Sequence, residues 1–96
     1  MRLALHGELD LATTPILEES IATAEIEGHP VVALDLTDLK FVDASGLKAI
    51  LNAHRRARRL GRAGISLLNP SSDVRRLLSL TAIDLTIEVV EPAGAV

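Results

Sequence analysis

Apolar residues recur along the first third of the chain with two different periods. Residues 3–9 alternate between leucines and polar or small neighbours, which predicts a strand with one buried face. Residues 17–24 carry apolar side chains at helical spacing. They follow Thr13-Thr14-Pro15, where a threonine cap and a proline at the first helical position indicate a helix start. We therefore expect a strand followed by a helix that ends at Gly28.

The rest of the chain continues the alternation of strands and helices. The apolar run 31–36 predicts a strand covered on both faces, and Thr37-Asp38 predicts the turn that ends it. An amphipathic helix is expected from about 47 to 60. Apolar stretches at 65–68 and 85–90 predict two more strands, with a short serine-capped helix between them. The β-α-β-α-β-α-β order predicts an α/β fold with three helices and a mostly parallel central sheet of about four strands.

Length and composition limit the class of protein. The 96 residues allow one domain, which we place at 1–91, with 92–96 as a C-terminal tail. Phe41 is the only aromatic residue, so the core must be aliphatic, and the absence of cysteine excludes disulfides and thiolate sites. No apolar run approaches the roughly 20 residues that span a bilayer, and no signal peptide is recognisable. We therefore expect a cytoplasmic protein that does not contact a membrane.

The net charge is −3, and the charged residues are unevenly distributed along the chain. Residues 1–40 contain eight acids and two bases, whereas residues 41–62 contain six bases and one acid. This asymmetry indicates charge-guided choice of a protein partner. The basic stretch 54–59 lacks interleaved aromatic residues, so we interpret it as a solvated helix face and expect no direct nucleic-acid binding.

The junction Phe41-Val42-Asp43-Ala44-Ser45-Gly46-Leu47 joins a predicted strand to a predicted helix. Ser45 stands near the helix start, where backbone N–H groups without partners favour a phosphate. Ser45 is therefore a candidate phosphorylation site, unless it only caps the helix. Asp43 either hydrogen-bonds the turn or has a functional role, in which it orients Ser45 or meets the partner. Gly46 either eases a tight turn or keeps the serine accessible to a kinase.

Catalytic and metal-binding patterns are missing from the sequence. There is no Gly-x-Ser-x-Gly elbow and no phosphate-binding loop of the Gly-x-x-x-x-Gly-Lys type. His54 lies nine residues after Ser45, about 900° of helical rotation and ~13 Å of rise, so it faces away. The three histidines share no metal-ligand spacing. We expect neither an enzyme nor a bound metal or cofactor.

The motifs together resemble a STAS domain, and within that family an anti-sigma factor antagonist. The matching pieces, in the family's order, are Gly7-Glu8-Leu9-Asp10, Leu34-Asp35-Leu36, the junction 41–47 and Asn69-Pro70-Ser71. The resemblance implies a bacterial stress-response protein that, when unphosphorylated, binds an anti-sigma factor serine kinase and frees a sigma factor for transcription. It further implies that the kinase phosphorylates Ser45 and so breaks the complex, and that a metal-dependent PP2C-type phosphatase restores it.

The contact surface expected for this partner is built around the acceptor serine. We assign to it Asp10, Asp43, Ala44, Gly46, Leu47 and the exposed face of the helix that follows. Because position 44 is alanine, Ser45 is the only acceptor in the junction.

Two departures from the family pattern and two other roles stay open. Members usually carry another strand before residues 3–9, so either the start is truncated or the sheet has an exposed edge that would support a homodimer. Ala82 stands where many relatives have a glycine that ends the last helix, which predicts a differently built end. The chain could instead be a STAS subunit of a membrane transport system that binds an ATPase without a phospho-switch. A scaffold that assembles through its edge strand is the third alternative.

Overall fold

The structure, a computed structural model, describes residues 1–91, so the tail predicted at 92–96 lies outside the described residues. Four strands form one sheet in the order β1-β2-β3-β4, and every neighbouring pair is parallel. The strands are β1 (Arg2–Leu9), β2 (Val31–Val42), β3 (Gly64–Leu68) and β4 (Glu88–Val90). The helices are α1 (Thr14–Ile26), α2 (Ala44–Arg59), α3 (Ser72–Leu80) and the short 3-10 helix η1 (Ile83–Leu85). The predicted α/β alternation and parallel sheet are confirmed.

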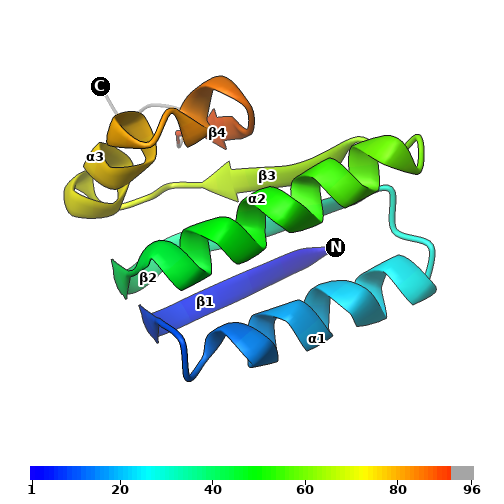
Figure 1. Ribbon diagram of the computed structural model, residues 1–96, viewed down its shortest axis with the longest axis horizontal. Coiled ribbons are helices and arrows are strands. Elements are labelled where there is room, and N and C mark those ends of the chain that lie inside the picture. Colours follow the sequence, from blue (N-terminus) through cyan, green and yellow to red (C-terminus); the bar gives the residue numbers. More distant parts are fainter. Residues whose placement is uncertain (92–96) are drawn as a thin grey trace.

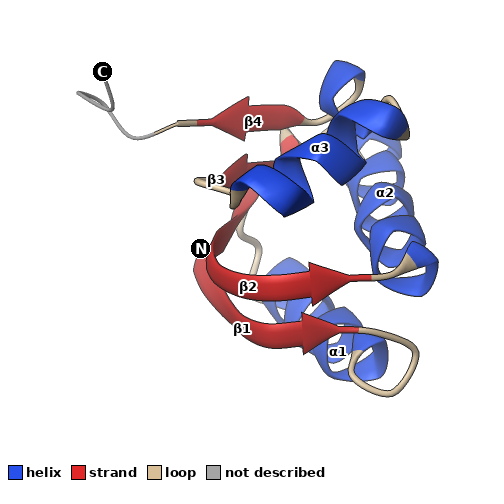
Figure 2. Cartoon of the chain, turned by 90° about the vertical axis from the view of Figure 1, so that its left-hand side faces the viewer, coloured by secondary structure: helices blue, strands red, loops and turns tan. Residues whose placement is uncertain are grey.

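Helices and strands form separate layers. Figures 1 and 2 show α1 and α2 side by side against one face of the sheet. Right-handed crossovers between strands that follow one another across a sheet place the connecting helices on the same face. The buried layer between them is aliphatic, as the composition predicts. Its most enclosed large side chains are Ile21, Leu34, Leu36, Leu39, Leu67, Val74, Leu78 and Ile87.

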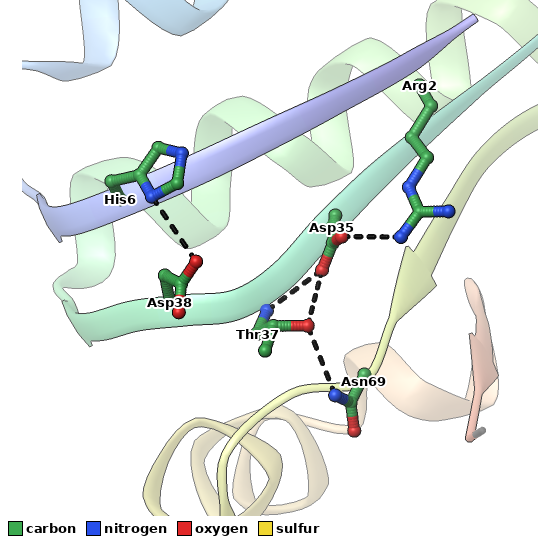
Figure 3. Close-up of polar contacts among 6 residues, drawn as sticks. All are labelled: Arg2, His6, Asp35, Thr37, Asp38 and Asn69. Carbon is green, nitrogen blue, oxygen red and sulfur yellow. Dashed lines mark hydrogen bonds and ion pairs between the residues drawn. The ribbon is translucent and has the colours of Figure 1, made fainter.

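The opposite face of β1 and β2 carries a polar network that Figure 3 shows in close-up. Asp35 accepts hydrogen bonds from the Arg2 guanidinium at 2.6 Å and from the Thr37 hydroxyl at 2.6 Å. The Arg2 contact is the main reason that the pKa of Asp35 lies far below its usual range. The Thr37 hydroxyl in turn accepts a hydrogen bond from Asn69 Nδ2 at 3.1 Å. The network therefore joins β1, β2 and the loop between β3 and α3.

Strand β2 is longer than expected. The turn predicted at Thr37-Asp38 is wrong, because the strand continues to Val42. The pairing of β1 with β2 shifts register between Ala4 and His6, and again between Gly7 and Glu8. At both places β2 contributes one more residue than β1, so each shift is a β-bulge in β2. The Thr-Asp pair bends the strand without ending it.

The last part of the chain also differs from the expectation. Residues 85–90 do not form one strand, because η1 precedes a shorter β4. The end of α3 has the usual geometry despite the alanine. Ala82 adopts the left-handed conformation with φ of 59°, which glycine reaches at lower cost.

Candidate functional site

Asp43 forms the corner between β2 and α2. Its backbone is extended, its N–H donates to the Leu9 carbonyl at 3.0 Å, and its Oδ1 accepts a hydrogen bond from the Gly46 N–H at 3.0 Å. The last contact is an N-cap, which satisfies one of the free donors of the first helical turn. Asp43 therefore caps α2, and the interpretation of Ser45 as the cap is wrong.

Ser45 is the second residue of α2 and is partly exposed. Its hydroxyl makes no hydrogen bond to any of residues 1–91. The first turn of α2 contains no acidic side chain of its own, and the Asp43 cap satisfies only the Gly46 N–H. A phosphate on this hydroxyl would lie close to the free N–H groups that begin the helix.

Gly46 is buried where α2 approaches the sheet most closely. A Cβ at this position would lie 2.7 Å from Leu9 Cγ and 2.9 Å from Val42 Cγ2, closer than side chains pack. Glycine is therefore required by helix–strand packing. The sequence alone suggested two other reasons, a tight turn and access of a kinase to the serine. Leu47 is also buried, at 8% exposure.

The structure brings the five predicted contact residues to one end of the sheet but at different depths. Ala44 is exposed, and Asp10 and Asp43 are partly exposed. The buried Gly46 and Leu47 lie beneath the surface, where they would support Ser45. A direct contact of any of the five with a partner stays a prediction.

Asp10 organises the loop between β1 and α1. Its Oδ1 accepts hydrogen bonds from the N–H groups of Ala12 and Thr13, both at 3.0 Å, and from the Thr13 hydroxyl at 3.1 Å. The Thr13 N–H, followed by the Thr13 hydroxyl, lowers the pKa of Asp10 below its usual value. Thr13 itself makes no side-chain cap to α1, contrary to expectation. Its hydroxyl also lies 2.9 Å from the Glu8 carbonyl, so this carbonyl and Asp10 Oδ1 are alternative acceptors of its one proton.

This loop and the start of α2 lie at the same end of the molecule, as Figure 2 shows. The reason is the pairing of Leu9 with Val42, the last residues of β1 and β2. Asp10 and Asp43 therefore follow neighbouring strands at the carboxyl edge of the sheet.

Two apolar side chains near this edge were missed by sequence reasoning. Leu11 is 76% exposed in the loop after β1, and Phe41 is 48% exposed one residue before the end of β2. The flanking Val42 faces the core, so the alternation of strand residues turns Phe41 outward. Leu11 follows Asp10 directly, and Phe41 lies two residues before Asp43.

His54 is not part of a solvated helix face, as the arginine-rich stretch suggested. It is 9% exposed, and its Nδ1 accepts a hydrogen bond from the Ile65 N–H at 3.0 Å. Burial, followed by the nearby Arg58, lowers the pKa of His54. The solvent-facing part of the stretch is partly paired, since the Arg56 guanidinium contacts Glu25 at 2.9 Å.

Two features of the described residues concern metal binding and membrane insertion. Within 1–91, no cluster of three or more histidine, cysteine, aspartate or glutamate residues is placed to hold a metal ion. None of the helices in the same range is both long and apolar enough to cross a membrane.

Comparison with known proteins identifies the family. A family model described as STAS domain matches residues 1–93 of this chain. The chain belongs to the STAS domain family. This STAS domain is 26% identical over 88 residues to the anti-sigma-B factor antagonist of Listeria monocytogenes, a match that covers 92% of this chain and 76% of that protein.

Solved structures show the same fold. An anti-sigma factor antagonist from Mycobacterium paratuberculosis superposes with a TM-score of 0.78 at 24% identity, over 97% of this chain and 77% of that one. The antagonist SpoIIAA in its unphosphorylated form gives a TM-score of 0.74 at 24% identity, over 96% and 79% of the two chains. The Bacillus SpoIIAA has also been solved in the phosphorylated form, which gives a TM-score of 0.73 at 23% identity over 97% and 82%. The names of the first two structures describe these proteins as anti-sigma factor antagonists.

Proposed function

We propose that this STAS domain is a cytoplasmic anti-sigma factor antagonist whose partner is an anti-sigma factor serine kinase. In its unphosphorylated form it binds the kinase and frees a sigma factor for transcription. Phosphorylation of Ser45 ends binding, and a PP2C-type phosphatase restores it. The relatives named as anti-sigma factor antagonists, one of them solved with and without phosphate, support this role.

The free hydroxyl of Ser45 is the observation that carries the proposal. Asp43 supplies the cap of α2, so the fold does not use the Ser45 side chain, and a kinase can modify it without removing a structural contact. The modification would also be tolerated electrostatically, because a phosphate is favoured at the start of a helix.

The charge of the phosphate explains how binding would end. Phosphorylation adds about −1.5 to −2 charge and three acceptor oxygens at neutral pH. Asp10 and Asp43 follow neighbouring strands at the same edge, so the partner would meet a surface that is already acidic. A penalty of about 3 kcal/mol would weaken binding roughly a hundredfold, since each ~1.4 kcal/mol is tenfold.

A pull-down from the native cytoplasm tests the proposal with three baits. We expect the wild-type chain to capture an ATP-binding kinase and Ser45→Asp to lose it. Ser72→Asp is the matched control, because Ser72 is an exposed first residue of α3 and receives the same charge at another helix start. It should retain the kinase.

Calorimetry with the recovered kinase then measures the affinity. Ser45→Asp should bind at least about a hundredfold more weakly than wild type, and Ser45→Ala should bind as wild type does. Equal affinity of Ser45→Asp and wild type would contradict the charge mechanism. Capture of a transport ATPase by all three baits would instead favour the alternative of a transporter subunit without a phospho-switch.

A further inference from the structure

Helix α2 carries a row of cations along its outward face. Four exposed residues of the helix follow one another at intervals of four, three and four positions: Lys48, Asn52, Arg55 and Arg59. At about 100° of rotation per residue, these intervals place the four side chains within about 60° of the helix circumference. The three cations among them form no ion pair within residues 1–91. We call these four residues the α2 stripe.

The fold itself does not account for the α2 stripe. The helix dipole favours Arg59 in the last turn, but not Lys48, which lies in the second turn near the positive end. Arg55 and Arg59 lie four residues apart, where like charges on a helix repel each other. No acidic side chain of α2 offsets this repulsion. In contrast, Arg56 beside the stripe contacts Glu25 of α1 at 2.9 Å. The stripe is therefore a surface whose charges have no anionic partner within the described residues.

Helix α1 beside the stripe has the opposite charge. It contains Glu18, Glu19 and Glu25 and no lysine or arginine. Glu18 and Glu19 are exposed, and Figures 1 and 2 show the two helices side by side. The outward surface of the helix layer is thus divided into an acidic helix and a basic helix. A molecule that binds the α2 stripe must be acidic and narrow enough to leave α1 uncovered.

This division of charge favours a protein segment over other polyanions. Packed helices lie about 8–10 Å apart, so any broader anionic surface on the stripe would also meet Glu18 and Glu19. A DNA duplex and an anionic bilayer are both broad surfaces of this kind. The net charge of −3 opposes them as well. An acidic helix or loop of a protein can instead follow a single row of cations.

We propose that the α2 stripe binds an acidic segment of the anti-sigma factor kinase. This inference rests on the proposed function and adds the charge of the partner surface. Ser45 lies at the start of the same helix, and Lys48 follows it by three residues. The modification site and the stripe therefore form one continuous surface. It is about 21 Å long from Ser45 to Arg59, at about 1.5 Å of rise per residue.

An acidic partner gives the phosphate on Ser45 two ways to weaken binding. A segment that reaches Lys48 comes within one helical turn of Ser45, where the negative phosphate repels its acidic side chains. The phosphate also attracts Lys48, because residues three apart are neighbours on a helix surface. Lys48 is then less available to the partner. The sign of the stripe thus explains why added negative charge would end binding.

Calorimetry with the recovered kinase tests the stripe by charge reversal. Arg55→Glu should weaken binding about tenfold in about 0.1 M salt. Arg76→Glu is the matched control, because Arg76 is an exposed cation of α3 that forms no ion pair within the described residues. It should bind as wild type does. Raising the salt to about 0.5 M should weaken the wild-type complex more than the Arg55→Glu complex, since salt screens exposed charges.

A second measurement needs no kinase and uses poly-L-glutamate as the acidic probe. In NMR spectra of the ¹⁵N-labelled chain, the probe should shift the backbone signals of the α2 stripe more than those of α3. Arg55→Glu should reduce these shifts. A DNA duplex at the same concentration of negative charge should shift the stripe less than the peptide does, because Glu18 and Glu19 oppose a broad polyanion. Circular dichroism checks that each variant is folded.

Four results would overturn the inference. They are equal affinity of Arg55→Glu and wild type for the kinase, an equal loss in Arg76→Glu, no shift of the stripe with poly-L-glutamate, and larger shifts with the duplex. Failure of the proposed function is distinct, because the wild-type chain would then capture no kinase or Ser45→Asp would retain it. A kinase that Ser45→Asp loses and Arg55→Glu binds at full affinity would keep the phospho-switch and exclude only the acidic contact.

Discussion

Three neighbouring residues at the start of α2 have different tasks. Asp43 caps the helix, and Gly46 allows it to approach β1 and β2. Ser45 lies between them, and its side chain has no such structural role within the described residues. A side chain that the fold does not need can change its charge without unfolding the domain. This division of tasks would allow Ser45, the modification site that we propose, to lie on a rigid corner of a small protein.

Gly46→Ala tests this division at the level of one methyl group. The added Cβ would overlap Leu9 and Val42, which are only 4% and 3% exposed and have little room to move. Overpacking costs about 1–3 kcal/mol, whereas alanine regains about 1 kcal/mol of helix propensity. Because the overlap involves two enclosed side chains, we take the upper end of that cost and expect a net loss of about 2 kcal/mol in the free energy of unfolding, measured with urea.

Ser45→Ala is the control for that measurement. It makes a similarly small change one residue away, at a partly exposed position, and should alter the free energy of unfolding by less than about 0.5 kcal/mol. A Gly46→Ala variant as stable as Ser45→Ala would show that α2 does not need the close approach.

At the scale of elements, the sequence predicted the helices and strands that are determined by residues close together in the chain. The strands and three helices follow from local periodicity and caps, and Ser71 indeed caps α3 by accepting from the Val74 N–H at 3.3 Å. The extension of β2 was missed because Thr37-Asp38 resembles a turn, and only the pairing with β1 makes it a bulge. The packing role of Gly46 likewise depends on strands distant in sequence.

The burial of His54 could have been recognised. It continues the spacing of Leu47 and Ile50 and precedes the buried Ala57, so it belongs to the inward stripe of α2. The arginines around it concealed that spacing, because charge dominated the interpretation of the stretch.

The end of α3 provides a prediction about one element. The Cβ of Ala82 makes the left-handed backbone conformation at this position sterically unfavourable, whereas glycine has no Cβ. Ala82→Gly should therefore raise the free energy of unfolding by about 1 kcal/mol in urea denaturation. Ala22→Gly, at an exposed position inside α1, should instead lower it by about 1 kcal/mol. Destabilisation by both changes would contradict the interpretation of Ala82.

For the whole molecule, the contact of His54 with Ile65 joins α2 to the first residues of β3. Gly64 permits it, since a Cβ there would lie 2.6 Å from His54 Nδ1. Nδ1 can accept the Ile65 N–H only while it carries no proton, and burial of the ring also disfavours the charged form. The joint between helix and sheet is therefore sensitive to pH.

The sign of that sensitivity follows from linkage. The pKa of His54 is lowered from 6.5 in the folded state, so below pH 6.5 the unfolded chain binds more protons. The contribution of His54 to stability is fully present above pH 6.5. It is lost as the pH falls from 6.5 through the pKa of His54 in the folded state. Asp10 and Asp35, whose pKa values are also lowered, lose their contribution only below their usual 3.8, so they do not act in this window.

Urea denaturation between about pH 7.5 and 5.5 isolates the histidine contribution. We expect the wild-type free energy of unfolding to decrease toward the acidic end, and His54→Gln to be less stable at neutral pH with a flatter pH profile. Asn52→Gln, which changes an exposed residue of the same helix that carries no titratable group, should keep the wild-type slope. An unchanged slope in His54→Gln would mean that another group controls this range, and that the link between α2 and β3 does not respond to protonation.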